Sequence, residues 1–373
     1  ATYAVGSVAR ALGGIVFGHF GDRIGRKKLL MLSLVMMGVA TVLIGLLPTY
    51  AAIGIWAPIG LIVLRLVQGF AVGGEWGGAV LMAAEHGDAA RRGFWASWPQ
   101  AGVAAGSLLS AGMLAIMAAS MSEAEFLDWG WRVPFILSAV LVAVGYYIRN
   151  RVSESPMFEA LEEAEDLPKL PAMDVIRDRP LAVLLGSGLR VGENISYYIL
   201  TVFSLTYLVD VAAESRELAL EALLIGAAVQ FFAIPLLARL SDRIGRRPVY
   251  AIGGLGLAAF IFLFFPMLAS GAPEQIIAAL VIGLIFHAAM YGPQAAFITE
   301  LFPTRIRYSG VSIAYQLTSI FAGSLAPIIA LWLYKEYGSA TPVAIYVAAA
   351  CAISGTSALL AKETRGTELD AIR

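Results

Sequence analysis

The chain has 373 residues, of which 59% are apolar and only 14% charged, so a soluble protein of this length could not bury its hydrophobic content. The net charge of −1 argues against a nucleic-acid partner, because no basic face is long enough to follow phosphates. The single cysteine, Cys351, excludes a disulfide framework and a cysteine-rich metal site, and we expect it to be a small packing residue. We expect no cofactor and no metal.

Apolar segments of about 20 residues, the length that crosses a bilayer, recur along the chain. They predict eleven membrane-spanning helices, at 1–17, 29–47, 56–83, 94–119, 131–148, 181–209, 218–238, 249–268, 276–299, 310–333 and 342–361. The third and sixth exceed one crossing, so we expect tilt or interfacial extensions. The first contains Arg10 and has no basic leader, which favours a membrane helix over a signal peptide.

The pentapeptide DRIGR occurs twice between long apolar runs, at 22–26 and at 242–246. A second repeat pairs Glu85, followed by two arginines and a glycine, with Glu300, which has the same types of residue after it. Chance is the alternative, but two repeats in the same register are typical of a duplicated membrane bundle. We therefore predict an all-α polytopic protein with two related six-helix halves.

The two DRIGR copies differ in position, because the first follows the first visible span and the second follows the second span of its half. We therefore expect one helix to be absent from the start of this chain. The predicted organisation is an N-terminal bundle at 1–149 with five visible spans, a central cytoplasmic loop at 150–180, a C-terminal six-helix bundle at 181–361 and a cytoplasmic tail at 362–373. The loop is interpreted as a linker between moving bodies, with a regulatory or binding segment as the alternative.

Basic residues gather in alternate loops, which hold both DRIGR copies, the central loop and the tail. The opposite loops contain only Arg132, Arg216 and Lys335. The positive-inside rule therefore predicts a multi-pass protein of the inner cytoplasmic membrane with its C-terminus in the cytoplasm. The remaining cations, Arg10, Arg65 and Arg190, lie inside the spans.

The third span carries Arg65, Gln68 and Glu75 on one helical face. Arg65 and Glu75 lie roughly 15 Å apart along the axis, too far for a direct pair, so each needs another partner. A charge at membrane depth costs at least about 2.5–3.5 kcal/mol, so we assign Arg65 and Gln68 to solute binding and Glu75 to proton coupling. We expect the glycines at 69, 73, 74, 77 and 78 to permit close helix packing.

A second polar face lies in the sixth span, at Arg190, Glu193, Asn194 and Tyr197, with Tyr198 beside it. Arg190 can bind a carboxylate through two hydrogen bonds, Asn194 and the tyrosines supply neutral hydrogen bonds, and Glu193 can carry the coupled proton. The alternative is an internal Arg190–Glu193 ion pair that only makes the helix insertable.

Arg10 lies 12 residues before Asp22, about 18 Å deeper along a helix, so we expect an anionic solute between Arg10 and Arg190 at the interface of the repeats. Gln294 is a further solute candidate. Weaker candidates are Gln100, Gln230, His287, Tyr291, Tyr315 and Gln316. For His287 two roles stay open, a hydrogen bond between helices or a proton carrier.

The stretch GHFGDRIGRKK at 18–28 resembles the cytoplasmic loop motif of the major facilitator superfamily. Together, RLVQGFAVGGEWGG at 65–78, ESPMF at 154–158 and ELFPTRIRYSG at 300–310 resemble its metabolite:proton symporter family. That family includes carriers of dicarboxylates, citrate, shikimate, proline and betaine. The resemblance implies alternating access and proton-coupled symport rather than enzymatic activity.

The DRIGR loops are interpreted as a conformational gate, with a purely orienting basic loop as the alternative. We expect Asp22, Arg23 and Arg26 to pair with Glu85 and Arg92 and to separate when the cytoplasmic side opens. The full set of predicted gating residues is Gly18, Gly21, Asp22, Arg23, Gly25, Arg26, Glu85, Arg92, Asp242, Arg243, Arg246, Glu300 and Arg307.

The function expected from these observations is proton-coupled symport of a small organic acid anion of the dicarboxylate, citrate or shikimate type. The alternatives are an osmolyte carrier for proline or betaine, an uncoupled facilitator and a transport-derived sensor. A membrane enzyme is excluded, because no nucleophile–base or metal-ligand constellation lies in the spans. The expected partners are the solute, the proton and the lipid bilayer, and we expect a monomer.

Overall fold

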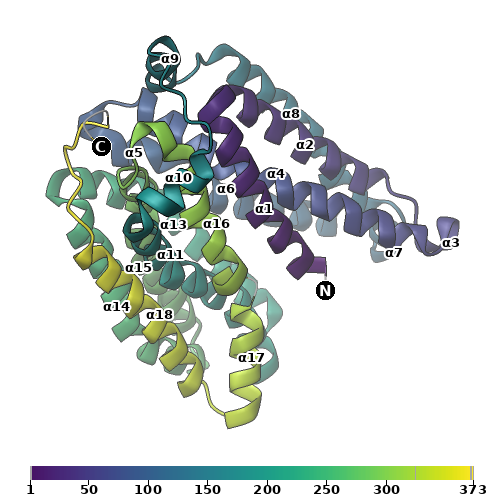
Figure 1. The fold of residues 1–373 in the computed structure, drawn as a ribbon. Coiled ribbons are helices and arrows are strands. Elements are labelled where there is room, and N and C mark those ends of the chain that lie inside the picture. Colours follow the sequence, from purple (N-terminus) through teal and green to yellow (C-terminus); the bar gives the residue numbers. More distant parts are fainter. Residues whose placement is uncertain (1, 324, 370–371, 373) are drawn as a thin grey trace. The chain divides into compact units, whose positions relative to one another are not determined.

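The computed structural model describes residues 2–323, 325–369 and 372, and in this part of the chain it contains helices and connecting turns but no strand (Figure 1). The α-helices are α1 (Thr2–Ile24), α2 (Arg26–Leu46), α3 (Tyr50–Ile53), α4 (Trp56–His86), α5 (Arg92–Ala96), α6 (Trp98–Ser120), α7 (Glu123–Asp128), α8 (Val133–Arg151), α9 (Pro156–Glu163), α10 (Pro171–Asp178), α11 (Pro180–Tyr198), α12 (Ser204–Thr206), α13 (Arg216–Ile244), α14 (Arg246–Leu268), α15 (Pro273–Thr299), α16 (Arg307–Thr318), α17 (Ala326–Tyr337) and α18 (Thr341–Leu360). Three π-helical turns, Ile199–Phe203, Tyr207–Val211 and Ser319–Gly323, interrupt the longest stretches.

Ten helical stretches of the described chain are long and apolar enough to cross a membrane. They are Arg26–Leu46, Trp56–His86, Ala89–Met117, Gly130–Arg151, Pro180–Val211, Arg216–Ile244, Arg246–Leu268, Pro273–Thr299, Thr304–Tyr337 and Thr341–Leu360. Each overlaps one predicted span, and the first predicted span coincides with α1, which is not among the ten. The all-α polytopic fold is therefore confirmed, with a span count that differs by one.

Helix contacts divide the chain into two compact units. Unit 1 comprises Ala1–Met82, Leu109–Arg177 and Thr304–Gln316, and unit 2 comprises Ala83–Leu108, Asp178–Pro303 and Leu317–Arg373. Each unit thus contains segments from both sequence halves. The division into two bundles at 1–149 and 181–361, which rests on the sequence repeat, stays a prediction.

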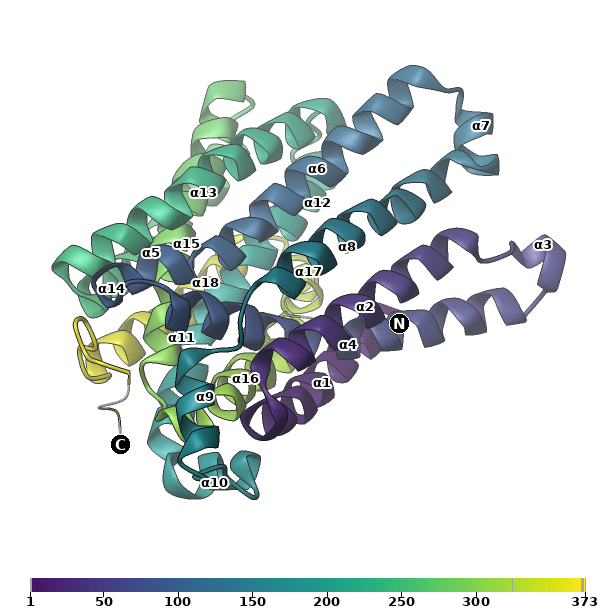
Figure 2. The same ribbon diagram turned by 90° about the horizontal axis from the view of Figure 1, so that it is seen from above.

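In unit 1, α2 runs beside α8 (Figure 2), and glycines bring α1 against α4. A Cβ atom at Gly13 would overlap the carbonyl of Phe70, and one at Gly73 would overlap the carbonyl of Arg10. A Cβ atom at Gly69 would overlap the carbonyl of Gly6, and one at Gly74, Gly77 or Gly78 would overlap a neighbouring side chain. The predicted packing role of these glycines is confirmed, because each lies where a Cβ atom has no room.

The largest helices of unit 2 are α11, α13, α14, α15 and α18. Helix α14 packs against both α15 and α18, and it lies beside α18 in Figure 1. The core of unit 2 is aromatic and aliphatic, with Leu257, Ile261, Phe264 and Phe265 of α14 almost fully buried. The polar side chains described below are therefore enclosed by apolar packing.

We predict that Gly13→Ala destabilises the protein by about 1–3 kcal/mol, because the added methyl group meets backbone that cannot rotate away. Gly106→Ala on α6 is the control, since a Cβ atom there meets nothing within 4 Å. Thermal unfolding in detergent measures both. Equal unfolding midpoints for the two variants would show that α1 and α4 do not need this close approach.

Candidate functional site

A network of buried polar side chains in unit 2 is centred on the carboxylate of Glu193 on α11. One Glu193 oxygen forms an ion pair with Arg190, one helical turn earlier. The other lies 3.0 Å from Nε2 of His287 on α15. Gln294, also on α15, donates from Nε2 to the first oxygen over 3.3 Å. The carboxylate thus has three polar partners where bulk water is excluded, which a buried charge requires.

His287 extends this network to a third helix. Its Nδ1 lies 2.8 Å from Nε2 of Gln230 on α13, so both ring nitrogens have a partner. The rings of Tyr197 and Tyr291 lie beside the imidazole, each with its centroid 5.3 Å away. His287 and Gln230 are weak candidates by sequence, yet in the structure they form a chain of hydrogen bonds with Glu193.

Two neighbouring amides keep an acceptor without a partner among the described residues, Oδ1 of Asn194 and Oε1 of Gln294. Asn194 Oδ1 lies against the π-helical turn Ser319–Gly323, where a Cβ atom at Gly323 would be 2.8 Å away. A second π-helical turn begins directly after Tyr198. Such turns are frequent at functional sites, and these two acceptors can receive hydrogen bonds from a solute.

In unit 1 the predicted solute residues have different surroundings. Gln68 donates to the hydroxyl of Thr41 over 2.6 Å. Arg65 is exposed and Arg10 half-buried, and neither forms an ion pair with a residue that the structure describes. Both cations therefore remain available to an anion. Arg10 and Arg190 belong to different units, so a solute held between them stays a prediction.

Glu75 of α4 forms an ion pair with a residue of another helix, as expected for a charge in a predicted membrane span. Arg149 of α8 lies 2.7 Å from its carboxylate and also donates to the carbonyl of Leu30. Both members of this pair keep at least a fifth of their side-chain surface exposed. The ion-pair partner of Glu75 is thus Arg149 and not Arg65. The part of Glu75 in proton coupling stays a prediction.

The first DRIGR copy binds the beginning of α16. The two carboxylate oxygens of Asp22 accept hydrogen bonds from the backbone N–H groups of Tyr308 and Ser309, over 3.1 and 2.8 Å. An aspartate is favoured there because the first N–H groups of a helix have no partner within it. Burial raises the pKa of Asp22 to about 6, although Arg26 and the two N–H groups lower it.

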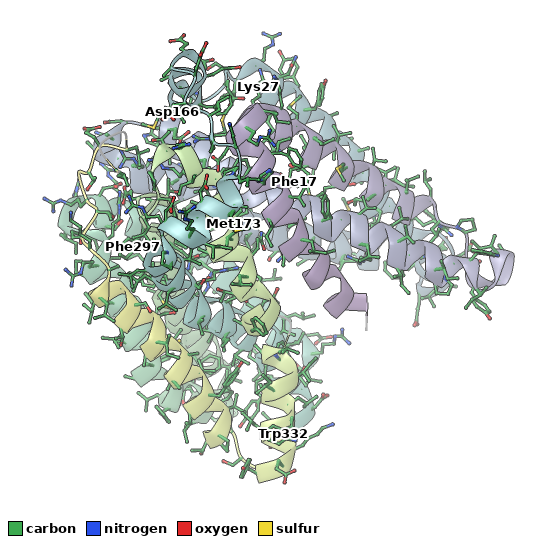
Figure 3. The ribbon with its side chains drawn as sticks, in the orientation of Figure 1. Phe17, Lys27, Asp166, Met173, Phe297 and Trp332 are labelled. Carbon is green, nitrogen blue, oxygen red and sulfur yellow. The ribbon has the colours of Figure 1, made fainter. Side chains whose placement is uncertain are left out.

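The turn after Asp22 is closed by the central segment. Gly25 has φ +109°, a conformation that side chains disfavour, and the carboxylate of Glu154 accepts from the N–H of Lys27 over 3.1 Å. Arg26 donates to Ser155 Oγ over 3.2 Å and to the carbonyl of Thr304 over 3.3 Å. The central segment therefore caps α2. In Figure 3, Lys27 and Asp166 both lie at the end of unit 1 that carries α9.

The second DRIGR copy makes the same kinds of hydrogen bond with other partners. Asp242 accepts from the N–H groups of Gly93 and Phe94 over 2.8 and 2.9 Å. Gly245 has φ +113°, and Glu363 accepts from the N–H groups of Arg246 and Arg247 over 2.9 and 3.1 Å. Burial acts to raise the pKa of Glu363, but these N–H groups outweigh it and hold that pKa below its usual range.

Arginine pairs complete this end of unit 2. Glu300 accepts from Arg92 over 3.0 Å and from Arg246 over 3.2 Å, and Arg246 also pairs with Asp242 over 2.6 Å. Within the units, Arg92 thus binds Glu300 and Asp22 binds backbone N–H groups. The predicted pairing of Asp22, Arg23 and Arg26 with Glu85 and Arg92 joins residues of different units and stays a prediction. The other predicted gating residues are placed as follows: Gly18 and Gly21 against α16, Arg23 and Arg243 exposed, Glu85 buried, and Arg307 buried with a hydrogen bond to Met157.

The two capping glutamates are not among the functional residues predicted from the sequence. Glu154 appears there only within the ESPMF motif, and Glu363 lies in the predicted tail. A signal was present, because Glu154–Ser155 and Glu363–Thr364 are similar dipeptides that each follow the last span of a half. Their role could not be read from the sequence, since each glutamate caps a helix more than 100 residues away.

Comparisons with known proteins agree with these motifs. The family model described as "Sugar (and other) transporter" matches residues 1–170 and 174–373. The chain is 40% identical to the inner membrane metabolite transport protein YhjE of Escherichia coli K12, covering 99% of the chain and 85% of the relative. It is 40% identical to the shikimate transporter of that organism, covering 98% and 84%, and 34% identical to its proline/betaine transporter, covering 99% and 75%. A solved structure of the major facilitator superfamily proton:xylose symporter XylE is similar in fold, with a TM-score of 0.78 at 18% identity. The match covers the whole of this chain and 87% of the XylE chain.

We predict that protonation of Asp22 stabilises the folded protein, because burial disfavours the charged carboxylate more strongly than Arg26 and the N–H groups of α16 favour it. A carboxyl group whose pKa rises from 3.8 to about 6 contributes stability that is fully present below 3.8 and is lost as the pH rises through 6. Relative to Asp22→Asn, which does not titrate, the wild type should lose up to about 3 kcal/mol of stability between pH 4 and 7. Thermal unfolding across this pH range measures the difference. Asp128→Asn, at an exposed position, is the control, and a difference that stays flat or grows with pH contradicts the prediction.

Proposed function

Because the chain belongs to the sugar (and other) transporter family and has the major facilitator fold, we propose that it is a secondary active transporter that moves a small organic acid anion together with a proton. The predicted family resemblance is confirmed, and the chain is a membrane transporter rather than an enzyme. The coupled ion and the solute are the proposed part.

The observation that carries the proposal is the buried ion pair of Arg190 and Glu193. While Glu193 is ionised it occupies the guanidinium group that a solute carboxylate would bind. A proton on Glu193 neutralises it and leaves Arg190 with an uncompensated charge, which is costly in a dry interior. A solute carboxylate then replaces Glu193 on Arg190. Proton and anion therefore bind together, as symport requires.

The other proposed solute contacts lie in both units. Asn194 and Gln294 offer their unpartnered acceptors, Tyr197 and Tyr198 offer hydroxyl groups, and in unit 1 Arg10, Arg65 and Gln68 are the candidates. Arginines favour an anion over a neutral sugar. The likeness to a shikimate transporter supports an organic acid, while the likeness to proline/betaine transporters supports the osmolyte alternative, since a zwitterion also carries a carboxylate.

We assign the DRIGR contacts to a cytoplasmic gate, with the C-terminus on the same side of the inner membrane. Asp22 and Asp242 each bind a pair of backbone N–H groups at a helix start, and in an alternating-access cycle these contacts break when that side opens. The distribution of basic residues and the inner-membrane relative support this orientation and location. A monomer suffices for this cycle.

The proposal predicts that Glu193→Gln removes proton-driven accumulation and leaves solute exchange. A glutamine cannot gain or lose a proton, so solute should only equilibrate, with an accumulation ratio of about 1. Proteoliposomes with an acidic exterior measure accumulation of radiolabelled shikimate, succinate, citrate, proline and betaine, and a pH dye records proton movement. Glu162→Gln, on the exposed face of α9, is the matched control.

Glu75→Gln tests the second candidate in the same assay. If Glu193→Gln and Glu75→Gln both still accumulate solute against a gradient, the assignment of the proton to these carboxylates is wrong. If the wild type equilibrates solute without moving protons, the protein is a facilitator.

A further inference from the structure

His287 is built into the network with both ring nitrogens engaged. Nε2 lies 3.0 Å from Oε1 of Glu193, and Nδ1 lies 2.8 Å from Nε2 of Gln230. Its side chain and that of Gln294 are completely buried, and Gln230 is nearly so. Because the Glu193 carboxylate only accepts hydrogen bonds, the neutral ring carries its hydrogen on Nε2, and the Gln230 amide donates to Nδ1.

Gln230 can serve both forms of Nδ1. A primary amide presents a donor at one end and an acceptor at the other, so a half-turn of its terminal group replaces the N–H that Nδ1 accepts with an oxygen that accepts from Nδ1–H. An apolar residue could do neither, and a carboxylate would only accept. The amide therefore leaves the histidine free to change its protonation without losing a hydrogen bond.

From this arrangement we infer that His287 relays the coupled proton to Glu193, with Gln230 as the positioning residue that adapts to the tautomer of the ring. The inference rests on the proposed function, since it names the route to the carboxylate that releases Arg190. Glu193 holds the proton in the loaded state, and His287 is the group through which it arrives and departs.

Each transfer balances. A hydronium ion gives its proton to the Nδ1 lone pair and becomes water, the ring becomes an imidazolium, and the turned Gln230 oxygen accepts the new N–H. The Nε2–H bond then breaks, its electron pair stays on the ring, and the proton bonds to Oε1 of Glu193. The result is a neutral carboxyl group and a neutral ring with its hydrogen on Nδ1. The reverse transfers return the proton after the solute has left.

The groups that face the imidazole favour this route. Glu193 attracts a proton and Arg190 lies on the far side of that carboxylate, while the flanking rings of Tyr197 and Tyr291 are uncharged. Gln294 is neutral and donates both to Glu193 and to Tyr250, so it holds the carboxylate without supplying a proton. Among the described residues, two titratable side chains hydrogen-bond to Glu193, those of Arg190 and His287.

The first test needs no solute. In detergent-solubilised protein labelled with ¹⁵N-histidine, we expect the His287 signals, identified by their loss in His287→Gln, to be those of the Nε2–H tautomer near pH 8. Toward about pH 5 the signals of the two ring nitrogens should change to those of an imidazolium or of the Nδ1–H tautomer. In Gln230→Leu the Nε2–H preference should weaken and the pH profile should shift. A ring that stays Nε2–H throughout this range in the wild type overturns the inference.

The second test separates the relay from the transport proposal. In proteoliposomes with radiolabelled shikimate and citrate, His287→Gln should lower accumulation driven by a pH gradient by about 100-fold and leave exchange of labelled for unlabelled solute at the wild-type rate. His86→Gln, at an exposed histidine, should match the wild type in both. If His287→Gln still accumulates solute as the wild type does, the relay is overturned. If His287→Gln is folded but loses exchange as strongly as accumulation, the relay is also overturned, and His287 has a structural or binding role. A wild type without proton movement instead overturns the proposed function, whatever the behaviour of His287.

Discussion

A charge that is removed from water has to be paired, and this requirement decides the placement of the polar residues in this protein. Glu193 is surrounded by Arg190, His287 and Gln294, Asp22 by two N–H groups, and Glu300 by two arginines. In each case the partner comes from a helix far away in sequence or one turn along the same helix. An apolar helix alone could rotate or slide against its neighbours with little loss, but a helix that carries half of a buried pair has one favourable register.

The same pairing serves two purposes at the two DRIGR copies and at Glu193. At the DRIGR loops the carboxylates bind backbone N–H groups and the following helix is capped by a distant glutamate, so the contacts define one conformation. At Glu193 the partners are the side chains of Arg190, His287 and Gln294. Under the proposed function, the first arrangement serves a gate whose contacts form and separate together, and the second serves the binding of a proton and a solute carboxylate.

Much of the fold follows from composition, because a bilayer admits long apolar helices and these are visible as uninterrupted runs. The predicted spans 249–268 and 276–299 nearly coincide with α14 and α15, and helical spacing correctly put Arg190 and Glu193 on one face. The spacing could not place His287 or Gln230 beside Glu193, since contacts between helices depend on their relative rotation. It also could not identify Glu300, which is 208 residues away, as a partner of Arg92.

The glycines between α1 and α4 have a mechanical consequence. Where Gly13 meets the carbonyl of Phe70 and Gly73 meets that of Arg10, no side chain separates the two backbones, so there is no rotamer whose change could let one helix slide along the other. Sliding of α1 along α4 is therefore disfavoured, and the backbone positions of Arg10 and Arg65 on these two helices keep a constant separation. Under the proposed function, in which a solute contacts both arginines, this separation would make selectivity depend on the length of the anion as well as on its charge.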